Sequence, residues 1–182
     1  MSRLGERAPE TMPADQRAVY EAIVSGPRGR MAGPFHAFLR SAGVAGPAQE
    51  LGAHLRFSGT LPGALRELAT LVVARYWTAR YEWQAHAGFG REEGLEDAVI
   101  EAIATRVTPT FADPDQQLVF ETCSELLETR TLSTTTYERA LAALGEESLV
   151  ELVSLVGYYS MVSLALNAFA IEPATDVDRL PD

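Results

Sequence analysis

The sequence predicts an all-α protein, and three features of its 182 residues support that class. Apolar residues recur at helical spacing through the centre of the chain, and the alternation of apolar and polar residues typical of a half-buried strand is not found. Polar or proline residues stand where the apolar segments begin, and glycines follow several of them. No repeat of solenoid type is present, so we expect one domain over residues 1–182.

The first third of the chain is expected to form short helices separated by loops. A helix at 14–26 begins beside an aspartate and ends at a glycine. The segment "GPRGRMAGP" contains three glycines and two prolines, so it is expected to be a loop. Two further short helices follow at 35–42 and 47–57.

The remainder contains the longer helices. Pro62 opens the most apolar central stretch, "LRELATLVVARYW", in which apolar residues cover most of a helical surface and indicate burial. Further helices are then expected at about 80–92, 96–105, 114–129 and 133–145, followed by a long apolar helix. The last residues, 173–182, form an acidic tail that is expected to pack loosely.

Composition excludes several functions. All fifteen basic residues are arginine, so neither a lysine Schiff base nor a phosphate-loop lysine is possible. The net charge of −10 repels phosphate groups, and we therefore expect no nucleic-acid partner. Cys123 is the one cysteine, so the chain cannot form an internal dithiol pair. The polar N-terminus lacks the apolar core of a signal peptide, and a cytoplasmic location is expected.

Residues 152–171 form an uncharged segment of twenty residues, which is long enough to cross a membrane. Its flanks are acidic, however, and no arginine lies near either end to set a topology. Serines, a glycine and an asparagine also lower its apolar character. We therefore expect a buried or subunit-interface helix, a homo-oligomer, and no membrane partner.

The stretch "RYEWQAHAG" carries the candidate site. On a helix, Glu82 and His86 lie one turn apart on the same face, and a carboxylate beside an imidazole is suited to acid–base chemistry. Such a pair is also common on solvated helices. The neighbouring Tyr81 and Trp83 favour a partly buried pair, because these rings make the helix too apolar to lie on the surface.

Glu67 interrupts the apolar run and is a third candidate. One explanation is a structural ion pair with an arginine such as Arg66 or Arg75. The other is a shared site with Glu82. On one straight helix these two carboxylates would lie about 22 Å apart, so a shared site requires a break near 77–79 or a second subunit.

The segment "LRELATLVVARYWTARYEWQAHAGFGREEGLEDAVIEAI" resembles the core motif of the carboxymuconolactone decarboxylase family, which includes the alkyl hydroperoxidase D-like proteins. The resemblance is close over residues 60–105, and "LVELVSLVGYYSMVSLALNAF" resembles the family's usual ending. It implies an all-α, alkyl hydroperoxidase D-like helical bundle that assembles as a trimer or hexamer.

The hydroperoxidase branch of that family carries two cysteines, a histidine and a glutamate at fixed spacing. His86 and Glu67 occupy the histidine and glutamate positions, whereas Ala79 and Glu82 stand at the cysteine positions. Neither residue can form a thiolate, so thiol peroxidase chemistry lacks its nucleophile. The decarboxylase-like branch lacks those cysteines and keeps the glutamate and the histidine, as this chain does.

The leading interpretation is a cofactor-independent acid–base lyase acting on a small carboxylated lactone or a related metabolite of aromatic degradation. His86 would donate the proton, Glu82 would orient the imidazole, and Glu67 would relay protons or tune the charge. Arg75 or Arg80 would hold the substrate carboxylate.

Tyr81 and Trp83 are the other candidates for substrate contact. Neither a cofactor nor a metal is expected, because the acid–base pair supplies two ligands while His36 and His54 lie in unrelated contexts. Two alternatives remain open. One is an alkyl hydroperoxidase D-like antioxidant protein with altered or lost thiol chemistry, and the other is a non-catalytic oligomer that binds a small molecule.

Overall fold

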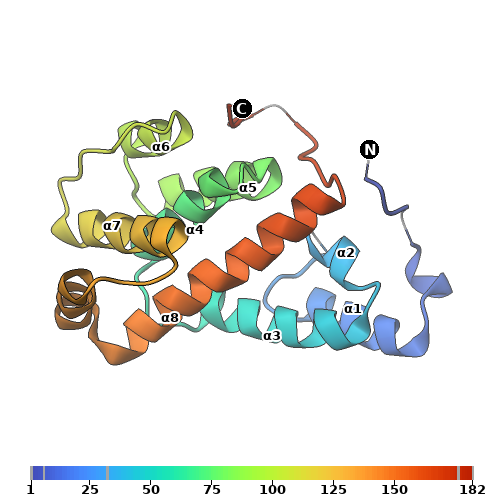
Figure 1. Ribbon diagram of the computed structural model, residues 1–182. Helices are drawn as coiled ribbons and strands as arrows, with labels where there is room; N and C mark the ends of the chain where they lie inside the picture. The colour runs from blue at the N-terminus through green and yellow to red at the C-terminus, as the bar shows by residue number, and fades with distance from the viewer. Residues whose placement is uncertain (1, 6, 32, 176, 182) are drawn as a thin grey trace.

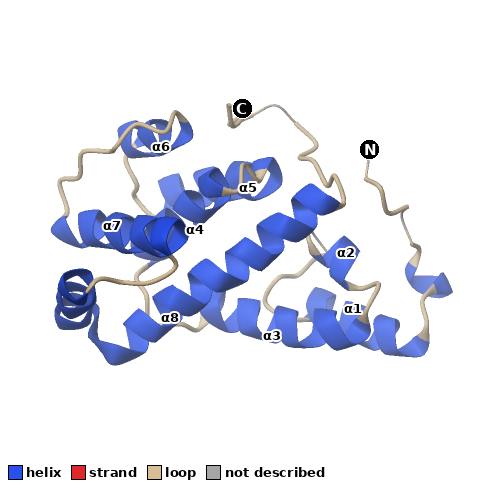
Figure 2. Ribbon diagram, in the orientation of Figure 1, coloured by secondary structure: helices blue, strands red, loops and turns tan. Residues whose placement is uncertain are grey.

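The structure is a computed structural model that describes residues 2–5, 7–31, 33–175 and 177–181, and every regular element in these ranges is helical (Figure 2). The all-α prediction is therefore confirmed. The elements are η1 (Pro9–Thr11), α1 (Ala14–Ser25), α2 (Phe35–Phe38), α3 (Ala42–Phe57), α4 (Gly63–Tyr76), α5 (Arg80–Glu92), α6 (Asp97–Ala104), α7 (Pro114–Thr129) and α8 (Thr134–Ala168).

The helix α8 crosses the molecule diagonally, with α1–α3 on one side and α4–α7 on the other (Figure 1). On one side α4 contacts α5, α6, α7 and α8, so it is the centre of the larger helical group. On the other side α3 packs on α1, α2 and α8. A site formed between α5 and α3 therefore lies beside the long helix that joins the two groups.

The central helix α4 is buried on nearly all sides, as its apolar sequence predicts. Ten of its fourteen residues are buried. Two of these ten are charged, Glu67 and Arg75, and charged side chains are seldom fully buried unless they are paired. The partners of Glu67 define the candidate site.

A sharp turn separates α4 from α5, near residues 77–79, where a site shared by Glu67 and Glu82 within one chain would need a break. The first helix ends at Tyr76 and the second begins at Arg80. Between them Thr78 has a φ of 49°, a left-handed conformation that few non-glycine residues adopt. Because the chain reverses here, α5 packs back along α4 instead of continuing away from it.

The expected boundary at residue 145 is also present. Gly145 has φ 79° and ψ 169°, a conformation available to glycine, so α8 consists of two helical segments that meet at a kink. Among the described residues α8 is the one helix long and apolar enough to cross a membrane. Of its most apolar stretch of 18 residues, 61% is buried inside the protein. Buried core helices share these properties, so this feature is weak evidence for a membrane span.

Three details differ from the sequence-based expectation. Helix α2 ends at Phe38, four residues before the expected end at 42. Helix α3 begins at Ala42, five residues before the expected start at 47, because Pro47 lies inside the helix and not in its first turn. The tail does not pack loosely: Leu180 is buried, and Arg91 forms two hydrogen bonds with Asp178 at 2.8 and 2.9 Å. Of this tail, Asp176 and Asp182 lie outside the described residues.

Candidate active site

His86 lies on α5 between two carboxylates. Its Nδ1 is 2.5 Å from Oε2 of Glu67, and its Nε2 is 3.1 Å from Oε2 of Glu82. The side chains of His86 and Glu67 are only 4% and 2% exposed, so water cannot compete strongly for these contacts. An imidazole with a carboxylate at each nitrogen donates at both positions, which is the bonding pattern of the charged imidazolium.

The two carboxylates reach the ring by different routes. Glu82 precedes His86 by one helical turn on α5, whereas Glu67 projects from α4, which the turn at Thr78 brings alongside. Glu67 also accepts a hydrogen bond from Nε of Arg66 at 3.3 Å through its other oxygen. Both sequence-based explanations of Glu67, a pair with arginine and a shared site, therefore describe real contacts.

The electrostatics favour a charged His86. Burial opposes the charge on the ring, but the hydrogen bonds from Glu67 and Glu82 outweigh it and raise the pKa of His86 to about 9. Burial would likewise raise the pKa of Glu67, but its hydrogen bond with the imidazole holds that pKa below the usual value. Around neutral pH, His86 is thus an imidazolium and Glu67 is a carboxylate.

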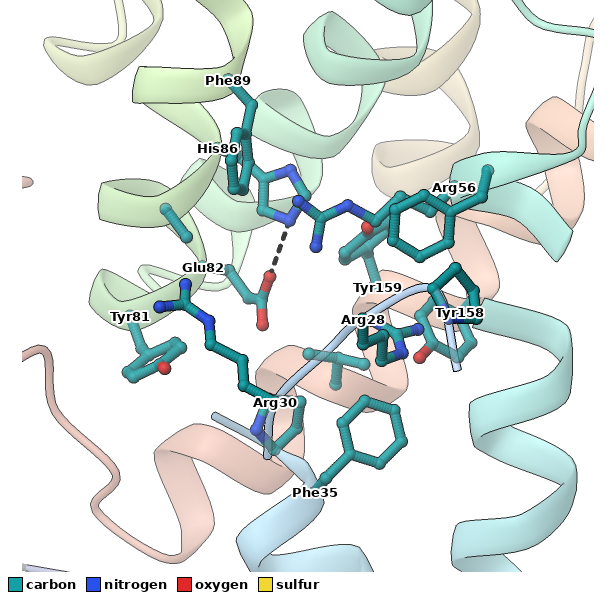
Figure 3. A pocket seen from close by; sticks show the side chains of 15 residues that line it. Arg28, Arg30, Phe35, Arg56, Tyr81, Glu82, His86, Phe89, Tyr158 and Tyr159 are labelled. Atoms are coloured by element: carbon teal, nitrogen blue, oxygen red, sulfur yellow. Dashed lines mark ion pairs between the residues drawn. The ribbon is translucent and has the colours of Figure 1, made fainter. Parts of the chain in front are cut away.

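A cavity of about 270 Å³ opens beside this group. Glu82 and His86 line the cavity (Figure 3), whereas Glu67 does not line it and contacts the imidazole through Nδ1. Tyr158 and Tyr159 of α8 also line the cavity. The remaining lining residues come from the loop after α1 and from α2, α3, α5 and α8, and they are Pro27, Arg28, Arg30, Pro34, Phe35, Arg56, Phe57, Tyr81, Ala85, Phe89 and Val162.

Three arginines line the cavity, although the protein as a whole is acidic. Arg28 stacks over Phe35 at 4.7 Å, and Arg56 stacks over Phe89 at 4.4 Å from the ring centroid. Figure 3 shows the third, Arg30, extending toward Glu82. Among the described residues none of the three forms an ion pair with a carboxylate, so their charge remains directed to the cavity and its opening. This arrangement is suited to an anionic ligand.

The two tyrosines supply neutral hydroxyl groups. Burial raises the pKa of Tyr158 to about 12 and that of Tyr159 higher still, and the negative charge of Glu82 adds to both shifts. The ring of Tyr159 also meets the ring of His86 edge-on at 5.0 Å. Tyr159 therefore packs the imidazole in place, and both phenols stay protonated throughout the physiological pH range.

Three of the residues expected to contact substrate lie away from this cavity. Arg75 points to the tail, where its Nη1 donates to the carbonyl of Pro181 at 2.9 Å, and Arg80 lies 3.9 Å from Glu172. Trp83 is buried in the core, on the side of α5 that faces the other helices. Of the four, only Tyr81 lines the cavity. Arg75 and Arg80, the arginines nearest to the site in sequence, therefore contact the chain that follows α8.

The arginines that do line the cavity were not identified from the sequence. Arg28 and Arg30 belong to the loop "GPRGRMAGP", and Arg56 lies in the last turn of α3. All three lie far from His86 in the sequence, so local spacing does not connect them with the site. One signal was available, namely two arginines in a loop rich in glycine and proline, where neither belongs to a helix.

Metal binding and thiol chemistry find little support in the site. Within the described residues no group of three or more His, Cys, Asp or Glu side chains is arranged to hold a metal ion. The two glutamates contact opposite nitrogens of one ring and so cannot converge on one ion with it. Cys123 is buried on α7, and burial raises the pKa of its thiol to about 12, far from the range of a reactive cysteine.

The sequence matches no family model and no curated protein. Solved structures are nevertheless similar along the whole chain. An uncharacterized peroxidase-related protein from Silicibacter sp. TM1040 has a TM-score of 0.76 and 14% identity, with 97% of this chain and 94% of that chain covered. An alkylhydroperoxidase AhpD core, described as an uncharacterized peroxidase-related protein from Ralstonia eutropha JMP134, has a TM-score of 0.77 and 15% identity, with 100% and 98% covered.

At these identities the likeness concerns the fold alone. The chain has an alkylhydroperoxidase D-like all-helical fold, as the sequence predicts. Both neighbours are described as peroxidase-related, so the fold is shared with proteins given that label. The chemistry must be argued from the side chains of this chain.

Proposed function

We propose that the protein is a cofactor-independent acid–base lyase, similar to carboxymuconolactone decarboxylase, which acts on a small carboxylated substrate. The supporting observation is the placement of His86, which is hydrogen-bonded between Glu67 and Glu82 and faces a cavity lined by three arginines. A charged imidazole with a pKa of about 9 is a proton donor at neutral pH. The arginines supply the counter-charge that a carboxylate substrate requires.

In the proposed reaction, cleavage of the bond between the substrate and its carboxylate releases carbon dioxide and leaves the electron pair on a dienolate. His86 then donates the proton on Nε2 to carbon, and the neutral imidazole regains a proton from solvent. Glu82 lines the cavity and orients this Nε2–H, and Glu67 holds Nδ1. Arg28, Arg30 or Arg56 takes the anchoring role assigned from the sequence to Arg75 and Arg80.

A thiol peroxidase is the less supported alternative. Ala79 and Glu82 stand where that mechanism requires cysteines, and Cys123 lies on a different helix outside the cavity. Its buried thiol is protonated at physiological pH. A non-catalytic binding protein remains the second alternative, because the same cavity could hold a carboxylate without converting it.

The test is the release of carbon dioxide from a small carboxylated lactone. His86→Gln should lower kcat by about 100- to 10,000-fold while leaving the circular dichroism spectrum unchanged. Glu82→Gln should move the alkaline limb of the pH profile to lower pH, because the imidazolium loses one of its carboxylates.

His54→Gln is the matched control, since His54 lies on α3 outside the cavity, and it should retain full activity. A His86→Gln variant with wild-type turnover would contradict the proposal. A wild-type protein that binds the lactone acid without releasing carbon dioxide would favour the non-catalytic alternative.

We further propose a cytoplasmic homo-oligomer, a trimer or hexamer, without nucleic-acid or membrane partners. Exposed apolar side chains on α8 form two pairs, each with members three residues apart, and the pairs are Val150 with Val153 and Met161 with Leu164. Such exposed pairs are suited to pack against another subunit. Sedimentation at micromolar concentration should show a trimer or larger assembly, and a stable monomer would contradict this part of the proposal.

A further inference from the structure

A second and larger cavity adjoins the first. Its volume is about 620 Å³, and it lies between the N-terminal segment, α1, α2 and the chain after α8. Tyr81 and Arg30 line both cavities. The first cavity is slightly smaller than a typical small-molecule site of about 300–1,000 Å³, whereas the second lies within that range.

The two cavities differ in chemistry. Polar groups of the second one are largely engaged with each other: Arg7 donates to Gln16 at 2.6 Å, and Arg40 donates to the carbonyl of Gly5. Arg30, His36 and Glu172 also line this cavity, beside a group of apolar side chains. The apolar side chains of the lining are Leu4, Met12, Tyr20, Met31, Leu39 and Ile171. Arg28 and Arg56, which line the first cavity alone, stack on Phe35 and Phe89 instead.

Tyr81 forms the partition between the cavities, and Gly33 shapes its position. Gly33 has a φ of 51°, and a Cβ atom there would lie 2.6 Å from Cε1 of Tyr81. The ring therefore packs directly on the loop backbone, at a point where any side chain would displace it. Figure 3 shows Tyr81 beside Glu82 at the edge of the first cavity, with Arg30 extending between them.

We propose that the two cavities form one binding site for an elongated amphipathic carboxylic acid. The carboxylate lies near Glu82 and His86 and is held by the arginines, while the apolar body passes Tyr81 and occupies the second cavity. This inference rests on the proposed function for the carboxylate end, and it adds the size and shape of the substrate. A compact lactone acid would leave the larger, more apolar cavity empty.

Isothermal titration calorimetry with hexanoate, octanoate, decanoate and dodecanoate tests the inference by binding alone. Each additional methylene buried should tighten binding about fourfold. Met31→Trp and Leu4→Trp each fill the second cavity from a different segment, so both should remove this dependence on chain length while leaving hexanoate affinity within about twofold. Tyr137→Trp is the control, because Tyr137 is exposed on α8 and lines neither cavity, and it should behave as the wild type.

The outcomes separate this inference from the proposed function. Hexanoate binding that weakens in Arg56→Gln, without any gain for longer chains, would overturn the two-cavity site and leave the acid–base proposal standing. A chain-length dependence that survives in both tryptophan variants would also overturn it. If the wild-type protein does not decarboxylate the lactone but binds longer acids more tightly as expected, the proposed reaction is contradicted and the two-cavity site is supported. Failure of every acid to bind would refute the inference.

Discussion

Among the described residues two histidines, His86 and His54, contact carboxylates, and their surroundings differ. His86 is buried, and both of its nitrogens meet carboxylates. His54, on α3, contacts Glu151 of α8 through Nε2 at 2.8 Å, and its side chain is 52% exposed. The first pair lines a cavity, whereas the second joins two helices at the surface.

The difference shows what a short distance between a histidine and a glutamate does and does not imply. Around His54, water screens the charge, and Glu151 is held independently by two hydrogen bonds from Thr60 at 2.6 and 2.8 Å. Around His86, screening is weak, because the side chains of His86 and Glu67 are only 4% and 2% exposed. Similar distances therefore correspond to a structural contact in one case and to a strongly perturbed acid in the other.

The largest expected effect is that of Glu67→Gln. Removal of one charge from a buried pair leaves the other poorly compensated, and the free energy of unfolding at pH 7 should fall by about 3 kcal/mol. Chemical denaturation measures this loss. Glu101→Gln, at an exposed position on α6, is the matched control and should change stability by less than about 0.5 kcal/mol. An equally small loss of unfolding free energy in Glu67→Gln and Glu101→Gln would mean that the buried contact of Glu67 with His86 stabilises the fold no more than an exposed side chain does.

The pH dependence of stability should report the same contrast. The pKa of His86 rises from 6.5 to about 9 on folding, because its bonds to Glu67 and Glu82 outweigh burial. Protonation of His86 therefore contributes fully to the free energy of unfolding below about pH 6.5, and this contribution is lost as the pH rises through about 9. Tyr159 from α8 also faces His86, and its raised pKa keeps its hydroxyl protonated throughout that window.

Urea unfolding of wild type and His86→Gln at a series of pH values measures this effect. The difference in unfolding free energy between the two proteins should shrink between about pH 6.5 and 9. The lowered pKa of Glu67 acts in the opposite direction, so its contribution is lost as pH falls below about 4.5. A difference in unfolding free energy that stays constant between about pH 6.5 and 9 would mean that folding does not raise the pKa of His86.

The sequence predicted the fold well because the signals were local. The apolar surface of α4, the glycine at 145 and the proline at 114 each act within a few residues. The sequence also indicated that a shared site for Glu67 and Glu82 would need a break near 77–79 or a second subunit, and the turn at Thr78 supplies the break that brings Glu67 to His86.

The arginines and the tail could not be placed by such arguments. Arg56 reaches the cavity because α3 packs against α8, and Arg75 turns away because the tail offers it a carbonyl. Both outcomes depend on contacts between segments far apart in sequence. Leu180 alone hinted that the tail docks, since an isolated leucine among acidic residues needs a place to be buried.

Cys123 provides a third case, a buried titratable group whose pKa is set by burial alone. Because nothing compensates the cost of a buried thiolate, the thiol should stay protonated and unreactive. Cys123→Ser should leave decarboxylation and ligand binding unchanged. Alkylation by iodoacetamide should occur only under unfolding conditions, and rapid alkylation of the native protein at pH 8 would contradict the burial of this residue.

The smallest effect is expected at His54. Its contact with Glu151 is exposed to solvent on one side, and an exposed pair contributes about 0–1 kcal/mol. His54→Gln should therefore lower the free energy of unfolding by less than about 1 kcal/mol, and the loss should shrink as salt is added. A double-mutant cycle with Glu151→Gln isolates the pair from the hydrogen bonds that Glu151 receives from Thr60. A coupling energy of about 3 kcal/mol between His54 and Glu151 that does not change with salt would mean that exposure of the histidine does not weaken the pair. The difference between His54 and His86 would then have to come from the second carboxylate that contacts His86.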